Sequence, residues 1–261
     1  MSSVKRTSYQ IFSSVVSALF LREIQTRFGS KKGGYFWALF DAMLMVLIFA
    51  GLKSMIADNS MPGIDFPVFL ASGFLAFFMW KNIVGGFMGA FSANAALFNY
   101  RQVRPFDTLV SRFLIELLVS TMATLAFISI GLYFEFDIAV QDFTMVMLAV
   151  AWLALFAFGF GLFSAVLATF FENYAKVVNI VMTPLLFISA LMYTVDSLPP
   201  ILREIILYNP LVHFIEMIHG NYFVTLSTEY VDYSYMFFWT FIPLFAGLYL
   251  YRGSEEGIIA P

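Results

Sequence analysis

Long, unbroken hydrophobic runs dominate this chain of 261 residues, and short polar connections separate them. A helix needs about 20 mainly apolar residues to cross a bilayer. The runs predict six transmembrane helices, over residues 35–56, 67–91, 108–134, 143–171, 176–195 and 235–251. Strands are not expected, because the apolar runs are continuous and do not alternate with polar residues. The pattern therefore predicts one all-α integral membrane domain over residues 1–261.

Residues 9–28 follow an amphipathic pattern instead. Large apolar side chains recur at four-residue steps, at Phe12, Val16, Phe20, Ile24 and Phe28. A helix with one apolar and one polar or basic face is typical of the headgroup layer of a membrane. We predict an interfacial helix over 9–28 with Arg22, Glu23 and Arg27 as its interface residues, and a simple anchor explains the pattern equally well. A cleaved signal peptide is disfavoured, because cleavage would place these arginines outside.

Residues 198–223 are apolar but interrupted by Pro199-Pro200 and by Asn209-Pro210. The pieces between them reach only ~14 Å as helices, too short for a ~30 Å hydrocarbon core. They predict a re-entrant helix pair over 199–219 that gates a water-accessible path, with Asn209, Pro210 and His213 as candidate gate residues. Two helices lying flat on the outer surface are the alternative.

Lysine and arginine are distributed unevenly between the two sides of the six-span topology. Eleven lie on one side, namely Lys5, Arg6, Arg22, Arg27, Lys31, Lys32, Arg101, Arg104, Arg112, Lys176 and Arg252. Only Lys53 and Arg203 lie on the other, whose loops are acidic. Basic loops stay in the cytoplasm, so both termini are predicted to be cytoplasmic.

The cytoplasmic connection after the second span combines aromatic and basic residues. Its candidate docking residues are Leu97, Phe98, Asn99, Tyr100, Arg101 and Arg104. Aromatic and arginine side chains dominate binding hot spots, so a short helix with Phe98 and Tyr100 exposed would suit docking to a soluble partner. A basic loop that binds lipid phosphate is the alternative. In the next helix, Arg112 and Glu116 are one turn apart and are expected to pair.

Ionisable and aromatic residues near the spans suggest a substrate path. Lys81 lies within the second span, where an ionisable residue is costly and often functional, although it can also reach the cytoplasmic interface. Aromatic residues make up 19% of the chain, and their faces can stack on sugar rings. The candidate path residues are Tyr35, Trp37, Phe40, Trp80 and Lys81. Core and interfacial packing explain the aromatic excess equally well.

Composition excludes several classes of protein. The chain is 61% hydrophobic and 12% charged, whereas soluble domains average about 45–50% and about 25%. A soluble globular enzyme and a disordered chain are therefore excluded, and the net charge of −3 argues against a nucleic-acid partner. Cysteine is absent, the two histidines lack metal-ligand spacing, and no HExxH, GxSxG or GxxxxGK[ST] motif occurs. We expect no metal site, no catalytic residues and no nucleotide hydrolysis by this chain itself.

Several motifs resemble those of ABC-2 type polysaccharide export permeases, in order and with matching spacing over nearly the whole chain. The opening stretches Leu19-Phe20-Leu21-Arg22-Glu23-Ile24, Thr26-Arg27-Phe28-Gly29 and Gly34-Tyr35-Phe36-Trp37-Ala38 are shared with O-antigen and teichoic-acid permeases. Three others resemble the capsular polysaccharide (KpsM-type) branch: Phe66-Pro67-Val68-Phe69-Leu70, the stretch from Leu97 to Pro105, and Asn209-Pro210-Leu211-Val212-His213.

The resemblance implies a half-transporter in the bacterial inner membrane. Two copies would form the channel, and a separate cytoplasmic ATPase dimer would bind ATP and Mg and drive it. Leu97 to Arg104 would match the coupling helix, and the pair over 199–219 the external re-entrant helices. The implied substrate is a lipid-linked acidic capsular polysaccharide, passed to a periplasmic adaptor and an outer-membrane exporter.

Three other functions remain as alternatives. A permease for O-antigen or teichoic acid belongs to the same class. An intramembrane glycosyl- or phosphotransferase would need clustered carboxylates or histidines, and His213, Glu216 and His219 are the only candidates. An ion-coupled secondary transporter is disfavoured, because neither an inverted repeat nor a midplane carboxylate pair is evident.

Overall fold

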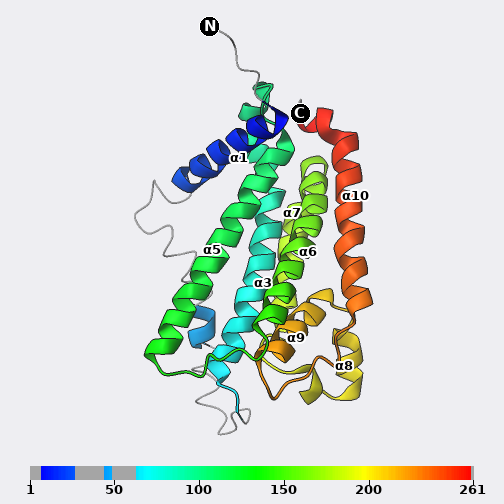
Figure 1. Ribbon diagram of the computed structural model, residues 1–261. Helices are drawn as coiled ribbons and strands as arrows, with labels where there is room; N and C mark the ends of the chain where they lie inside the picture. The colour runs from blue at the N-terminus through cyan, green and yellow to red at the C-terminus, as the bar shows by residue number, and fades with distance from the viewer. Residues whose placement is uncertain (1–6, 27–43, 49–62, 260–261) are drawn as a thin grey trace.

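The computed structural model describes residues 7–26, 44–48 and 63–259, and every regular element in these ranges is helical (Figure 1). The elements are α1 (Ser8–Ile24), α3 (Phe66–Met88), α4 (Ala90–Asn94), η2 (Ala95–Asn99), α5 (Pro105–Tyr133), α6 (Phe143–Phe170), α7 (Tyr174–Phe187), η3 (Val195–Ser197), α8 (Pro200–Ile206), α9 (Pro210–Tyr222) and α10 (Tyr233–Ile259). The predicted all-α class is confirmed for these residues.

Four helices, α3, α5, α6 and α10, are long and apolar enough to cross a membrane. They match four of the predicted spans, those over 67–91, 108–134, 143–171 and 235–251, within a few residues except where α10 continues to Ile259. The predicted first span, 35–56, lies almost wholly outside the described residues; only 44–48 are described, and they are helical.

The prediction of a continuous helix over 176–195 is wrong. Helix α7 has 14 residues and ends at Phe187, so it reaches only about 21 Å. Pro184 lies inside its last turn and cannot donate a backbone hydrogen bond, and Ala190 adopts a left-handed conformation with φ of 56°. The chain after Phe187 therefore bends, with Ser189, Ala190 and Leu191 fully buried, and composition does not distinguish such a buried bend from a helix.

Helix α3 forms the centre of the molecule. Its side chains Phe69, Phe74, Phe77 and Phe87 are fully buried, and α6 packs along it. Helix α10 packs on another side of α6 (Figure 1). Burial of one helix by its neighbours within a single chain explains the continuous apolar pattern of α3, which shows no polar face.

Two glycines permit the close approach of α6 and α10. A methyl group at Gly247 would lie 2.8 Å from the backbone nitrogen of Phe163, and one at Gly159 would lie 2.9 Å from Leu244 Cβ. Such distances are too short for carbon contacts, so a side chain at either position would force the two helices apart.

We predict that Gly247→Ala lowers stability by about 1–3 kcal/mol, because the added methyl group meets rigid backbone. Gly253→Ala, on the same helix, is the matched control, since a methyl group there meets nothing within 4 Å. Thermal unfolding of the purified variants in detergent measures both. Equal melting temperatures for the two variants would show that this helix contact is not tight.

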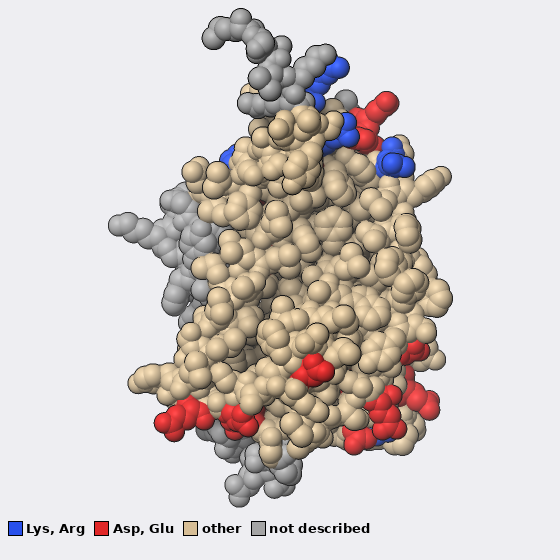
Figure 2. Space-filling view, in the orientation of Figure 1, with Lys and Arg blue, Asp and Glu red and all other residues tan. Residues whose placement is uncertain are grey.

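The two ends of the molecule differ in charge. On the face shown in Figure 2, lysine and arginine side chains lie at the end that holds α1 and the C-terminus of α10, and most aspartate and glutamate side chains lie at the opposite end. Helices α8 and α9 lie at this acidic end (Figure 1). We call these the basic end and the acidic end. The segregation agrees with the charge pattern of the sequence.

Candidate functional site

The connection between α3 and α5 forms a compact projection at the basic end. Helix α3 ends at Met88, and after Gly89 the chain continues through α4 and η2 and enters α5 at Pro105. Proline suits the first turn of a helix, and the Asp107 carboxylate accepts a hydrogen bond from the Arg104 backbone N–H at 2.9 Å. We call residues 97–104 the docking segment.

Most of the predicted docking residues are exposed. Tyr100 is 65% exposed, and Asn99, Arg101 and Arg104 are exposed around it. Leu97 is half-buried. The prediction that Phe98 is exposed is wrong, because its ring is buried in the main hydrophobic core. Phe98 therefore anchors the docking segment, and Tyr100 is its exposed aromatic residue.

A groove of about 680 Å³ separates the docking segment from α1. Its walls are mostly apolar, and the lining side chains are Ile11, Ser14, Val15, Ala18, Leu19, Arg22, Leu97, Gln102 and Val103. The predicted interface helix and the predicted docking loop thus form one continuous surface, which the sequence did not indicate.

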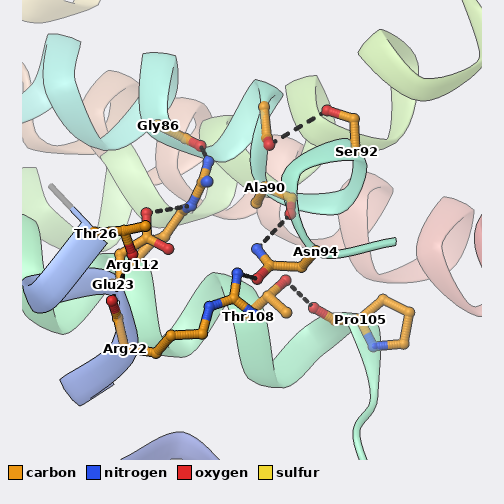
Figure 3. A network of polar contacts seen from close by, with 11 residues as sticks. Arg22, Glu23, Thr26, Gly86, Ala90, Ser92, Asn94, Pro105, Thr108 and Arg112 are labelled. Carbon is orange, nitrogen blue, oxygen red and sulfur yellow. Dashed lines mark hydrogen bonds and ion pairs between the residues drawn. The ribbon is translucent and has the colours of Figure 1, made fainter. Parts of the chain in front are cut away.

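Polar contacts connect α1 to the helices beside the docking segment (Figure 3). Arg22 Nη2 donates to Asn94 Oδ1 at 2.9 Å, and Asn94 Nδ2 donates to the Ala90 carbonyl at 2.8 Å. Asn94 is 3% exposed. The sequence pattern did not indicate Asn94, although a polar amide in a mostly apolar stretch was an available signal.

Glu23 and Arg112 form the second polar contact of α1. Glu23 Oε1 lies 3.2 Å from Arg112 Nε, and both side chains are mostly buried. Arg112 also donates to the carbonyl of Gly86, near the end of α3, where helical carbonyls lack partners within the helix. The spacing of one helical turn predicted Glu116 as the partner of Arg112, and it could not predict this long-range pair with Glu23. Arg27, the third predicted interface residue, lies outside the described residues.

The predicted gate residues at the acidic end connect short helices to their neighbours. The Asn209 side chain accepts from Leu211 N–H at 3.1 Å, which caps α9, and donates to Ser189 Oγ at 2.8 Å beyond the end of α7. Pro210 begins α9. His213 Nε2 lies 2.9 Å from the Leu207 carbonyl, and its Nδ1 accepts from Asp232 N–H at 3.1 Å. A neutral imidazole with its proton on Nε2 satisfies both contacts.

Glu216, on the same helix, is 94% buried and accepts a hydrogen bond from Val195 N–H at 3.2 Å. It lies outside the four long helices. Burial raises the pKa of Glu216 to about 7, although the Val195 hydrogen bond opposes the shift and nearby Asp196 adds to it. The raised pKa means that the folded protein favours the protonated carboxyl group.

We predict that Glu216→Gln stabilises the protein at pH 8 and has little effect at pH 5. As pH rises from 4.5 towards 7, the unfolded chain ionises Glu216 before the folded protein does, so folding loses free energy. A glutamine carries no charge and keeps the carbonyl that accepts the Val195 bond. Thermal unfolding of both proteins at the two pH values measures the difference. A difference that is independent of pH would contradict the prediction.

Of the predicted path residues, the structure describes Trp80 and Lys81. Trp80 is 3% exposed and packs against Phe156 and Phe160, so in this structure it is a core residue with almost no surface to line a path. Lys81 is half-buried, with Nζ 5.4 Å from the centre of the Phe78 ring. Tyr35, Trp37 and Phe40 lie outside the described residues.

Comparison with known proteins identifies the family. Residues 14–223 match the ABC-2 type transporter model. The chain is 36% identical to the polysialic acid transport protein KpsM of Escherichia coli over 97% of this chain and 98% of the relative. It is 30% identical to the capsule polysaccharide export inner-membrane protein CtrC of Neisseria meningitidis, over 99% of both chains, and 28% identical to BexB of Haemophilus influenzae, with the same description, over 97% and 96%. The chain therefore belongs to the ABC-2 type transporter family.

Proposed function

We propose that this chain is the membrane-spanning permease subunit of an ATP-driven exporter of capsular polysaccharide in the bacterial inner membrane. The observation that carries the proposal is the similarity, over nearly the full length, to a polysialic acid transport protein and to two capsule export proteins. Lipid-linked acidic glycan is the proposed substrate. The chain supplies the conduit, and a separate ATPase dimer binds ATP and Mg and supplies the energy.

The exposed docking segment supports the proposed ATPase partner. Tyr100, Arg101 and Arg104 are exposed at the basic end, beyond the long helices α3 and α5. An exposed aromatic ring followed by two exposed arginines, in a segment fixed to the core by Phe98, has the composition of a protein-binding hot spot. We propose that the ATPase docks here and that the basic end, with both termini, faces the cytoplasm.

The directions of the helices support six crossings. Helices α6 and α10 both run from the acidic end to the basic end, so the chain between them must return (Figure 1). We propose that α7 and the segment 188–194 make this return as the fifth crossing. Ser189, Ala190 and Leu191 in this segment are fully buried, as non-helical backbone at membrane depth requires. Helix α1 lies towards the basic end and α3 begins at the acidic end, which supports a first crossing over 35–56.

The proposal also assigns roles to the helices at the two ends of the molecule and includes further partners. Helix α1 would lie in the cytoplasmic headgroup layer, with exposed Phe12 in contact with lipid. Helices α8 and α9 would form the external re-entrant gate. A second copy of this chain would complete the channel, and a periplasmic adaptor and an outer-membrane exporter would receive the polymer.

Co-purification tests the proposal. We expect the tagged chain, expressed with the ATPase of its transport locus, to retain that subunit in detergent at equal stoichiometry and to hydrolyse ATP only with it. Deletion of the gene is expected to abolish surface capsule. Retained capsule with altered O-antigen or teichoic acid would favour another glycan as the substrate. ATP hydrolysis by the isolated chain would contradict the proposal that a separate subunit is the ATPase.

A further inference from the structure

Helix α1 is fixed to the short helix that precedes the docking segment. The Arg22 guanidinium reaches the buried amide of Asn94, the last residue of α4, and Asn94 also bonds the first carbonyl of α4 (Figure 3). A hydrogen bond from a charged donor is stronger than one between neutral groups, and burial of Asn94 shields this one from water. The contact spans 72 positions in the sequence.

A second contact fixes the next residue of α1 to two long helices. Arg112 of α5 pairs with Glu23 and also bonds the carbonyl of Gly86 in α3 (Figure 3). A methyl group at Gly89, where α3 gives way to α4, would lie 3.6 Å from Arg112 Nη1. The guanidinium therefore lies where α1, α5 and the end of α3 meet.

The docking segment follows directly from this junction. Helix α4 continues without a linker into η2, and the buried ring of Phe98 holds η2 on the core. A displacement of the docking segment must therefore act on Asn94 within a few residues. Close-packed interiors transmit such displacements, because side chains have little free space into which they can move.

We infer that Arg22 and Asn94 are positioning residues for energy coupling, which join α1 and the docking segment into one unit that moves together. The Glu23–Arg112 pair holds the same junction on α5. The inference rests on the proposed function, because it takes the docking segment as the ATPase contact. An ATPase that shifts the docking segment then also shifts helix α1.

Alanine variants at the two positions test the coupling. We expect Arg22→Ala and Asn94→Ala to keep the ATPase bound and hydrolysing ATP, but to lower the polymer exported per ATP several-fold. The double variant should be no worse than either single variant, because both remove the same contact. Arg22→Lys should recover part of the loss. Ser92→Ala is the control on α4, since within the described part of the chain that hydroxyl bonds the Gly89 carbonyl of its own turn.

A cross-link between α1 and α4 provides a second test. The chain contains no cysteine, so a thiol reagent would react only with the cysteines that are introduced. We expect the Arg22→Cys, Asn94→Cys double variant to export poorly and to recover when a short bifunctional methanethiosulfonate reagent joins the two thiols. Each single cysteine variant with the same reagent is the control. Recovery shows that a fixed connection is sufficient for coupling.

Three results would overturn the inference. They are unchanged export per ATP in the alanine variants, loss of the bound ATPase from them, and inhibition of export by the cross-link. Loss of the ATPase would mean that the contact only maintains the docking surface, and inhibition would mean that α1 and the segment must move apart. A wild-type chain that retains no ATPase would instead refute the proposed function.

Discussion

Reversing the charge of Arg101 and Arg104 is expected to abolish export while the chain still folds and inserts. Both side chains are exposed and close to Tyr100 along the chain, so the change removes little packing, although Arg104 also interacts with Asp107 at the start of α5. Charge reversal at a docking surface replaces attraction by repulsion of the same partner groups. We therefore expect the double variant Arg101→Glu, Arg104→Glu to lose the ATPase and surface capsule together.

Detergent pull-down of the ATPase and capsule staining measure this prediction. Lys176→Glu is the matched control, because Lys176 is also exposed, follows the end of α6, and bonds only its near neighbour Asn173. The control should keep ATPase and capsule. Normal capsule in the double variant would show that the docking segment is an ordinary basic loop in contact with lipid phosphate.

Replacing His213 by leucine is expected to have the second large effect, a loss of stability and of export. The imidazole joins the end of α8 to the start of α10 through Leu207 and Asp232. Leucine would leave that carbonyl and that backbone N–H without their partner in a buried place, at a cost of about 1–3 kcal/mol each. The short helices α8 and α9 have little helical stability of their own, so they depend on such contacts.

His219→Met is the matched control on the same helix. His219 is fully buried against Phe69. Within the described residues neither of its ring nitrogens has a partner at full hydrogen-bond geometry, and the Phe69 backbone gives it a weak polar contact. Its replacement by an apolar side chain therefore removes less polar contact than the loss of His213 does, and we expect a smaller loss of stability. Thermal unfolding and surface export distinguish the two variants. Equal losses in both would show that packing of α9, and not the hydrogen bonds of His213, holds the outer helices.

Hydropathy predicted the positions of the four long helices, because a long apolar run is enough to specify each of them. Helices α3, α5, α6 and α10 occur where apolar runs are long enough to cross a bilayer, and Pro105 and Pro210 each lie at the first position of a helix, where proline is favoured. Hydropathy could not predict that α7 ends at Phe187. A buried turn and a membrane helix have the same composition, and the left-handed conformation of Ala190 depends on tertiary packing.

The sequence also predicted most of the exposed docking residues but assigned one ring incorrectly. Tyr100 and Phe98 are two positions apart and equally aromatic, yet only the first is exposed. Which of them faces the core depends on the course of η2 over the neighbouring helices. Trp80 is another aromatic residue whose surroundings composition does not reveal, because its ring packs against Phe156 and Phe160 of α6.

By itself, the sequence determined that this is a helical membrane protein with one basic and one acidic end. Both properties follow from the preference of each side chain for lipid or for water, which the residue type alone sets. Only the tertiary structure decided which polar groups meet inside it. Arg22 with Asn94, and Glu23 with Arg112, are pairs of residues more than seventy positions apart. Such contacts depend on how helices α1, α4 and α5 pack, and no local pattern along the chain records that arrangement.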